Sequence, residues 1–406
     1  MTIRLRWLTV FAVFVMGGCA LPPTPPVTQA PPAKPPVAPP PRVTPPPVTT
    51  PPALPSSAVL KAADWAQLPG WIDNDALAAW PVFMVSCGPL KKQAAWQAVC
   101  ESAAQQTPQD DAAARAFFER WLLPYQLSTT EGNDTGLITG YYEPLLFGSR
   151  TPTSRYRFPI YAVPEDMLII DMGSVYPELK TYRLRGRVEG KRVVPYHNRA
   201  DIEAARAPLA GKELVWVDDA VDLFFLQIQG SGRVQLQSGE VVRIGYAEQN
   251  GHPYVSVGKK LVDMGELNVD QASMQGIKQW GIRNPEKLPA LLNQNASYVF
   301  FRELPPSPNG PPGALGIPLT DGRSIAVDPR AVTLGVPVYL ATTFPNSTQA
   351  LNRLVLAQDT GGAIKGVVRA DFFWGYGDAA GKQAGSMRQQ GKMWVLLPKN
   401  GSPNAH

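Results

Sequence analysis

Two aspartates near the carboxyl end of the chain lie beside residue types that favour acid–base chemistry. Asp359 is followed by the glycine-rich stretch "TGGAIKG", and Asp371 comes directly before the rings of "FFWGYG". Glycines let a ligand approach the backbone closely. Large apolar rings exclude water from a carboxyl group and raise its pKa, as a general acid working near neutral pH requires. Turn-capping aspartates beside core aromatics are the alternative, and spacing alone leaves both interpretations open.

Three other stretches combine amides, tyrosines and small residues in a way that suits a sugar ligand. In "FFLQIQGSGRVQL" we expect a strand that ends in neutral amides beside a bare backbone turn. "TGYYEP" and "GYAEQNGHPY" add aromatic rings with polar tips, which serve as platforms for sugars. Strand ends and hairpin turns without a ligand are the alternative for each stretch. With two residues from the aspartate segments, the expected substrate-binding residues are Tyr141, Tyr142, Glu143, Gln227, Gln229, Gly230, Ser231, Gly232, Tyr246, Asn250, Lys365 and Trp374.

The amino-terminal residues 1–19, "MTIRLRWLTVFAVFVMGGC", read as an export signal. Their apolar stretch is about half the ~20 residues needed to span a bilayer. A cysteine directly after two glycines resembles a bacterial lipobox, although Met16 replaces the usual leucine. We therefore expect lipidation of Cys19 and anchoring at the periplasmic face of the outer membrane of a Gram-negative bacterium. Cleavage near Ala20 as an ordinary signal peptide is the alternative.

Residues 20–57 are expected to form a proline-rich tether. Positions 21–55 hold 17 of the 43 prolines, so no hydrophobic core can form there. An extended chain of this kind rises ~3.1 Å per residue and could reach on the order of 100 Å. That reach suits an enzyme leashed to a membrane, although a merely solubilising spacer has the same composition.

Bulk properties exclude several function classes. The chain has 406 residues and is 44% hydrophobic, which is enough for a folded core. The formal charge of +5 is mild and scattered, so nucleic acid is not an expected partner. The three histidines are scattered as well, and we expect neither a metal nor another cofactor. Cys87 and Cys100 are expected to form a disulfide in an oxidising compartment, with two buried thiols as the alternative.

The pattern of the chain predicts a mainly β protein with helices, of the α+β class. Residues 58 to about 127 read as mainly helical, and short strands with glycine and proline turns follow. Tight turns are expected at Glu189-Gly190 and Ser238-Gly239. Helices are expected around 270–280 and at 285–293, the second capped by Asn284. Many short strands separated by such turns suggest a barrel.

These motifs together resemble the membrane-bound lytic murein transglycosylase A family. The resemblance runs from about residue 75 to 397 through "TGYYEP", "ELVWVDDAVDLFFLQIQGSGRVQL", "NASYVFFRE" and "GPPGALGIPLTDGRSIAVDPRAVTLGVPVYL". Residues 320–397 resemble the three-aspartate (3D) domain, whose pattern adds Asp328 to the two aspartates above.

The resemblance implies a division of the chain. A discontinuous double-psi β-barrel would form from 58–157 and 297–398, and a mostly β inserted domain from 158–296. A groove for glycan would lie between them, and residues 399–406 would form a disordered tail.

The resemblance also implies a reaction. Asp371 would be the catalytic acid and base, with Asp359 and Asp328 in support. The enzyme would cleave the β-1,4 bond between N-acetylmuramic acid and N-acetylglucosamine and leave 1,6-anhydromuramic ends. Peptidoglycan strands would be the substrate, and cell-wall synthesis or scaffold proteins are possible partners. The rivals are a muramidase or glucanase in which Asp359 activates water, and a lipoprotein that binds peptidoglycan without cutting it.

Overall fold

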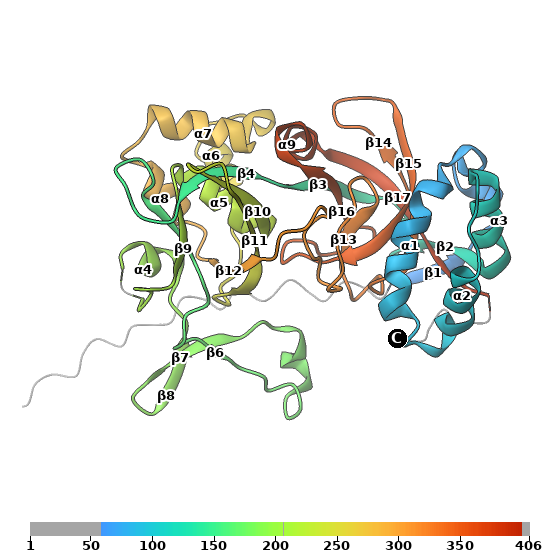
Figure 1. Ribbon diagram of the computed structural model, residues 1–406, viewed down its shortest axis with the longest axis horizontal. Coiled ribbons are helices and arrows are strands. Elements are labelled where there is room, and N and C mark those ends of the chain that lie inside the picture. Colours follow the sequence, from blue (N-terminus) through green and yellow to red (C-terminus); the bar gives the residue numbers. More distant parts are fainter. Residues whose placement is uncertain (1–57, 206, 400–406) are drawn as a thin grey trace, which may run out of the picture. The chain divides into compact units, whose positions relative to one another are not determined.

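The computed structural model describes residues 58–399 except residue 206 (Figure 1). The expected signal, tether and lipidated Cys19 therefore lie outside the described residues, as do the last residues of the expected tail. The helices are α1 (Ala76–Leu90), α2 (Ala94–Ala104), α3 (Asp111–Trp121), α4 (Arg199–Glu203), α5 (Ala220–Gln229), α6 (Val257–Asp263), α7 (Met274–Arg283), α8 (Leu288–Leu292) and α9 (Gly377–Ser386). The strands are β1 (Val59–Ala62), β2 (Leu122–Ser128), β3 (Gly136–Glu143), β4 (Leu145–Ser149), β5 (Phe158–Tyr161), β6 (Leu168–Ile169), β7 (Arg185–Glu189), β8 (Arg192–Pro195), β9 (Glu213–Val217), β10 (Ser231–Leu236), β11 (Val241–Gln249), β12 (Val299–Leu304), β13 (Ser324–Val327), β14 (Pro337–Thr343), β15 (Ala350–Asp359), β16 (Ala370–Tyr376) and β17 (Arg388–Pro398).

Six strands close into a ring. Their order is β17-β14-β15-β13-β16-β3, and β3 pairs back onto β17. The pairs β13–β15 and β16–β3 are parallel, while the other pairs in the ring are antiparallel. β2 and then β1 extend this sheet from β17. The ring joins one early strand to five from the last part of the chain, so the barrel is discontinuous in sequence.

Three amino-terminal helices cover one side of this barrel (Figure 1). They lie in the stretch from residue 58 to about 127 that the sequence predicts to be mainly helical, which also contains β1 and β2. Asp110 caps α3 by accepting a hydrogen bond from the amide of Ala113 at 2.8 Å. Phe117 and Phe118 on α3 pack against Trp80 of α1 in the main hydrophobic core. Aromatic packing thus joins α1 to α3 within the core that these helices share with the barrel strands.

A second sheet has the order β12-β11-β10-β4-β9-β5 and spans Leu145 to Leu304. It is wider than the inserted domain expected at 158–296, because β4 and β12 pair with its strands and not with the barrel. The inserted part is also not mostly β, since α4 to α8 lie within it. A third small sheet, β6-β7-β8, contains the expected hairpin at Glu189-Gly190, and the turn at Ser238-Gly239 joins β10 to β11.

Helix α5 corrects the prediction of a strand ending at Gln229. Asp219 accepts hydrogen bonds from the amides of Val221 and Asp222, which caps the helix, and Gly230 ends it with a φ of 80°. The apolar run "LFFLQI" fits a buried strand or a buried helix equally well, and only the caps distinguish them.

Two other helices differ from the prediction. The helix expected at 285–293 starts only at Leu288, because Asn284 ends α7 instead of capping a new helix. Helix α9 was not predicted, since its small residues resemble a turn. In the part of the chain that the structure describes, no helix has the length and apolar character to cross a membrane.

Candidate active site

A single row of residues across four neighbouring strands holds the two aspartates. Thr139 on β3 lies opposite Asp371 on β16, Asp371 lies opposite Ala326 on β13, and Ala326 lies opposite Asp359 on β15. Residues opposite one another share a face of a sheet, so these side chains emerge on the same side. Neighbouring strands are ~4.8 Å apart, which places the two aspartate backbones on the order of 10 Å from each other.

Asp371 is a partly exposed carboxyl with an elevated pKa. Burial raises its pKa to about 6, and the negative charge of Asp359 acts in the same direction. The hydroxyl of Thr139 opposes this by donating a 2.5 Å hydrogen bond to Oδ1. Arg369 also opposes it, and its guanidinium donates to the Thr139 oxygen at 2.8 Å. A carboxyl with this pKa can both give and take a proton near neutral pH.

Asp359 is held in place by three hydrogen bonds. Its Oδ1 accepts from the backbone amides of Ala314 at 2.8 Å and Thr360 at 2.9 Å, and its Oδ2 accepts from the hydroxyl of Tyr141 at 3.0 Å. Burial raises its pKa despite these bonds. Tyr141 itself is 8% exposed and packs on Phe373, so it orients a carboxylate and offers little ring surface to a ligand.

Asp328 lies outside the row and is only 1% exposed. Arg330 donates to its two oxygens at 2.9 and 2.7 Å, and the amide of Gly366 donates at 2.9 Å. Burial raises its pKa, but these hydrogen bonds outweigh burial and hold the pKa below the usual value. The structure thus supports a positioning role, in which an ionised Asp328 fixes the loop between β15 and β16.

The aromatic residues after Asp371 divide between two faces of β16. Phe373 shares the face of Asp371, whereas Phe372 and Trp374 point to the other side and pack against each other at 5.0 Å. Trp374 also donates its ring N–H to the sulfur of Met387 at 3.2 Å. The expected desolvation of Asp371 is present, but only one of the three rings lies on its side. Trp374 is not placed to bind the ligand of this row.

Two expected ligand amides belong to the core of the inserted part. Gln227 accepts a hydrogen bond from Arg199, whose guanidinium lies between the rings of Phe224 and Tyr298 at 4.8 and 4.9 Å. Asn250 is 1% exposed, and its amide bonds three backbone groups at 2.9 Å each. Protein groups thus hold both side chains in this structure, and their part in substrate binding stays a prediction.

The glycine turn after α5 has a structural explanation as well. Gly230 ends the helix, and Ser231 begins β10 opposite Gly245. A Cβ added to Gly232 would lie 2.5 Å from the Cδ1 atom of Leu226 and 3.1 Å from the carbonyl oxygen of Pro144, so packing favours a glycine here. The structure gives these residues no direct part in the aspartate row.

Glu143 makes a buried ion pair that ties the two sheets together. It is 1% exposed and accepts from Arg233 of β10 at 2.8 and 2.9 Å, while its Oε1 atom has no hydrogen-bond partner among the described residues. The Arg233 guanidinium lies 4.0 Å from the centre of the Tyr376 ring. The sequence predicted a substrate contact, and the structure instead shows a link from β3 and β16 to the second sheet.

Tyr142 and Gln229 line a cavity of about 170 Å³ between β3, α9, α5 and α7. The amide of Tyr142 donates to Gln229 at 3.1 Å, and its hydroxyl lies 3.4 Å from the sulfur of Met274. Alternation along β3 turns Tyr142 away from the face of Thr139. This cavity therefore lies behind the aspartate row.

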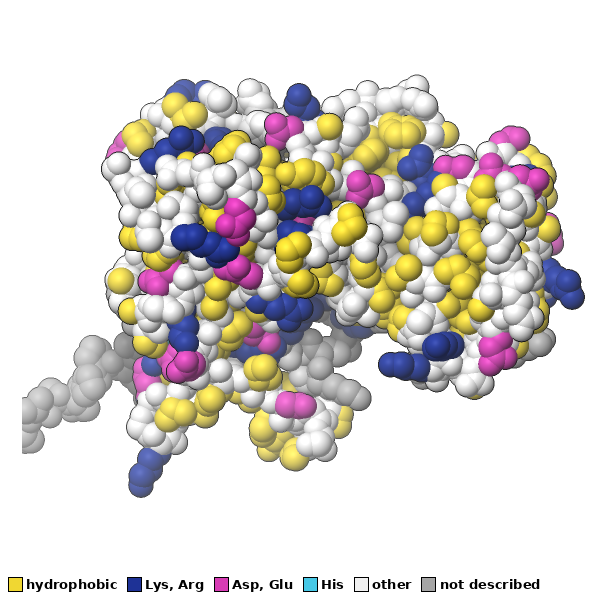
Figure 2. All heavy atoms as spheres, viewed as in Figure 1, with side chains coloured by type: hydrophobic (Ala, Val, Ile, Leu, Met, Phe, Trp, Pro, Cys, Tyr) yellow, Lys and Arg dark blue, Asp and Glu magenta, His cyan; other side chains and the backbone are white. Residues whose placement is uncertain are grey.

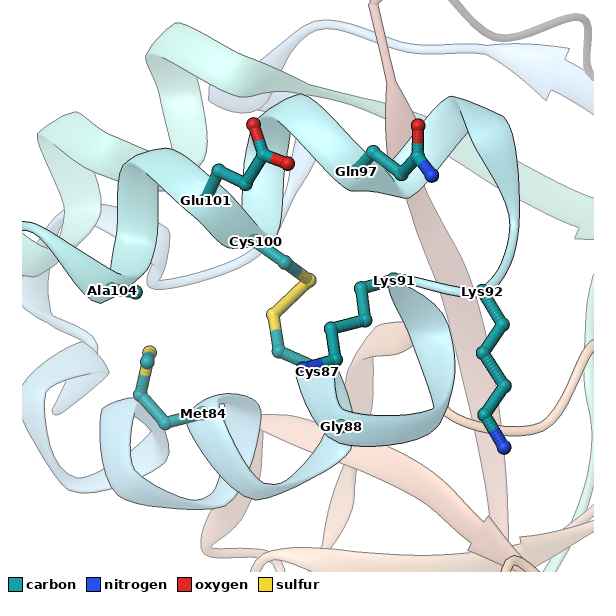
Figure 3. A pocket seen from close by; sticks show the side chains of 9 residues that line it. All are labelled: Met84, Cys87, Gly88, Lys91, Lys92, Gln97, Cys100, Glu101 and Ala104. Atoms are coloured by element: carbon teal, nitrogen blue, oxygen red, sulfur yellow. A yellow bond between two sulfur atoms is a disulfide. The ribbon is translucent and has the colours of Figure 1, made fainter.

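A larger cavity of about 560 Å³ lies between α1 and α2 (Figure 3). Cys87 and Cys100 form a disulfide on its wall, with an S–S distance of 2.11 Å. Lys91 and Lys92 extend from the loop between the helices. None of the substrate-binding residues expected from the sequence lines this cavity.

The exposed side chains near the row include one cation that the sequence did not single out. Arg183, from the segment before β7, is exposed, and its positive charge lowers the pKa of Asp359. Burial lowers the pKa of the exposed Lys365, and Arg183 adds to that shift. Tyr246 is 37% exposed and donates to Glu248 at 3.1 Å. Lys365 and Tyr246 are thus the expected ligand residues that are exposed, whereas Tyr142, Gln229, Gly230, Ser231 and Trp374 are half-buried.

Sequence reasoning also missed Thr139 and Arg369, the two residues that contact or tune Asp371. Thr139 begins the "TGYYEP" motif and Arg369 stands two positions before Asp371. Both residues thus lie in or beside stretches that the sequence analysis singled out, and their position there was the available signal. Among the described residues no cluster of histidine, cysteine and acidic side chains could hold a metal ion. Acidic and basic side chains are interspersed over the face that Figure 2 shows.

Comparisons with known proteins agree with this arrangement. Residues 137–302 match the MltA specific insert domain and residues 323–397 match the 3D domain. Over 288 residues the chain is 31% identical to membrane-bound lytic murein transglycosylase A of Escherichia coli K12, covering 69% of this chain and 70% of that protein. The crystal structure of MltA from Neisseria gonorrhoeae is 43% identical, with a TM-score of 0.73 over 85% of this chain and 94% of that one.

The E. coli MltA structure with bound chitohexaose is 26% identical and has a TM-score of 0.60, covering 85% of this chain and 94% of that one. The two domain matches together span most of the two sheets that the Glu143–Arg233 ion pair joins. By its domains, its identity to curated relatives and its fold, the chain belongs to the membrane-bound lytic murein transglycosylase A family.

Proposed function

We propose that the protein is a lytic transglycosylase that cleaves the β-1,4 bond between N-acetylmuramic acid and N-acetylglucosamine in peptidoglycan, in cell-wall turnover and remodelling. The observation that carries this proposal is Asp371, a partly exposed carboxyl whose pKa burial raises to about 6. The names of the relatives and the chitohexaose bound to one of them support a glycan substrate.

In the proposed reaction Asp371 acts twice. Its protonated form gives a proton to the glycosidic oxygen as the bond from that oxygen to the anomeric carbon breaks, and the N-acetylglucosamine side leaves with a hydroxyl group. The resulting carboxylate then takes the proton of the muramic 6-hydroxyl as that oxygen bonds to the anomeric carbon. No water is consumed, and Asp371 ends protonated as it began. A pKa near 6 suits a group that must serve as acid and base in turn.

Asp359 supports this reaction by charge. Its three hydrogen bonds fix it in the row, and its negative charge raises the pKa of Asp371. A fixed anion also stabilises the positive charge that develops on the sugar ring when the glycosidic bond breaks. Asp359 transfers no proton in this scheme.

The finer architecture also belongs to the proposal. A double-psi topology for the barrel is supported by the closed ring of six strands with parallel pairs β13–β15 and β16–β3. The glycan would lie in a groove over the aspartate row, between the barrel and the inserted part. Arg183, Lys365 and Tyr246 are the exposed residues that would line it.

The cellular setting of the proposal is the periplasmic face of the outer membrane. The family name supports association with the envelope, and the sequence suggests a lipid on Cys19 followed by the proline-rich tether. Proteins of cell-wall synthesis or scaffolding would be natural partners for an enzyme that opens the wall.

The products of digestion test the proposal. Purified peptidoglycan is digested, reduced with borohydride and measured by mass spectrometry. We expect 1,6-anhydro ends, which are one water lighter than hydrolytic ends and take up no hydrogen. Asp371→Asn should abolish release while the variant still binds glycan, and Asp378→Asn, at an exposed position of α9, should behave as wild type. Reducible, hydrated products would show a muramidase and reject the mechanism.

A further inference from the structure

Strand β15 contains one extra residue directly before Asp359. Ile325 of β13 lies opposite Ala357, whereas the next residue, Ala326, lies opposite Asp359. Gln358 therefore has no partner in β13 and forms a β-bulge. Bulges shift all later side chains of a strand to the other face. In a regular pairing Gln358 would occupy the row with Asp371, and the carboxylate of Asp359 would point into the core.

The side chain of Gln358 is fixed by hydrogen bonds to two buried serines. It is 0% exposed, and its Nε2 donates to the hydroxyl of Ser86 on α1 at 2.8 Å. Its Oε1 accepts from the hydroxyl of Ser324 on β13 at 2.5 Å. Both serines are fully buried as well. These three residues, Ser86, Ser324 and Gln358, are called the bulge anchor below.

The backbone of the bulge also supplies the surroundings of Asp359. The amide of Leu315 donates to the carbonyl of Gln358 at 3.1 Å, and the preceding amide, from Ala314, donates to the Asp359 carboxylate. A Cβ on Gly313 would lie 2.6 Å from the Gln358 carbonyl oxygen, so this loop is packed tightly on the bulge. A shift of Gln358 would therefore move Asp359 and one of its hydrogen-bond donors together.

We propose that Gln358 is a positioning residue for the reaction, and that the bulge anchor places Asp359 in the row with Asp371. Helix α1 then supports the active site as well as the core, and so does the disulfide that starts at Cys87, next to Ser86. The inference rests on the proposed roles of Asp371 and Asp359.

A double-mutant cycle with Gln358→Leu and Asp359→Asn tests the inference. Misplacing a supporting group by about 1 Å can cost ~10²-fold in rate, so Gln358→Leu should lose activity on that order. The high-pH limb of its rate profile should move to lower pH, because the charge of Asp359 no longer raises the pKa of Asp371. The double variant should be no less active than Asp359→Asn alone. The inference is wrong if the two losses of activity multiply in the double variant. It is also wrong if the high-pH limb of the rate profile of Gln358→Leu lies at the same pH as that of the wild type.

Two further variants separate positioning from simple loss of stability. Gln227→Leu removes a buried glutamine from the core of the inserted part, and its effect should multiply with that of Asp359→Asn without moving the limb. Ser86→Ala removes only one partner of Gln358 and should shift the limb in the same direction as Gln358→Leu, even if the latter folds poorly. If Asp359→Asn itself retains full activity, the proposed role of Asp359 fails. If Asp359→Asn is impaired and Gln358→Leu acts independently of it, the bulge inference alone fails.

Discussion

Asp371→Asn should make the protein more stable at neutral pH while removing its activity. The pKa of Asp371 is about 6 in the folded protein, against 3.8 for an unperturbed aspartate. A pKa difference of ~2 units at ~1.4 kcal/mol each corresponds to about 3 kcal/mol. Because the side chain is partly exposed, a gain of about 2 kcal/mol is a realistic expectation.

The sign of this effect follows from the direction of the shift. The folded state holds the Asp371 proton more tightly than the unfolded state, so both states are protonated below pH ~4 and the wild type bears no penalty. As pH rises from about 4 to about 6, the unfolded state ionises first and the wild type loses stability. Asparagine does not ionise, so the advantage of the variant should grow over this window and level off above it.

Guanidinium unfolding at pH 4, 5, 6 and 7 measures this difference. Asp328→Asn is the matched control with the opposite sign, because hydrogen bonds from Arg330 hold the Asp328 pKa below the usual value despite burial. That variant should be less stable than wild type at pH 7. If Asp371→Asn gains nothing at pH 7, or gains the same amount at pH 4, Asp371 is not a desolvated acid and the reasoning fails.

Two other substitutions test the surroundings of Asp371 and the proposed lipid anchor at Cys19. Thr139→Val removes a hydrogen bond to a charged group worth ~1.5–3 kcal/mol, so the high-pH limb of the rate profile should rise by about 1–2 units; an unmoved limb would contradict this. Thr342→Val is its control, because the Thr342 hydroxyl bonds only the Gln390 carbonyl at 2.8 Å. Cys19→Ala should move the protein from washed membranes to the soluble periplasmic fraction, and retention in the membranes would exclude the lipid anchor.

The strands of the carboxyl-terminal half were readable from sequence because glycine and proline turns separate short β-branched runs. The helix α5 was misread since "LFFLQI" is apolar at nearly every position, which leaves no period to distinguish a helix from a strand. Asp219 at the start and Gly230 at the end were the available signals. Helix α9 lacks a large apolar stripe altogether, so its packing against the paired strands β3 and β16 decides its structure.

The sequence predicted the two carboxylates of the candidate site, but not the residues that form hydrogen bonds with them. Glycines and rings beside Asp359 and Asp371 are local signals. The hydroxyl of Thr139 is 232 positions away in sequence from the carboxylate it bonds, and only the strand pairing brings them together. The buried partners of Gln227 and Asn250 could not be predicted either, because an amide in a motif looks the same in sequence whether its partner is a sugar, a guanidinium or a backbone group.

The barrel can close only after the last strands of the chain have been synthesised, because β3 pairs with them. A ribosome makes β3 early, yet its partners in the ring are β16 and β17, which come from the last part of the chain. Pairings between segments so far apart in sequence form slowly and late. A chain that stops before β17 already carries Asp328, Asp359 and Asp371, but it has no closed ring to align them with Thr139. We therefore expect an unfinished molecule to be inactive, because activity waits for the last strand to close the ring.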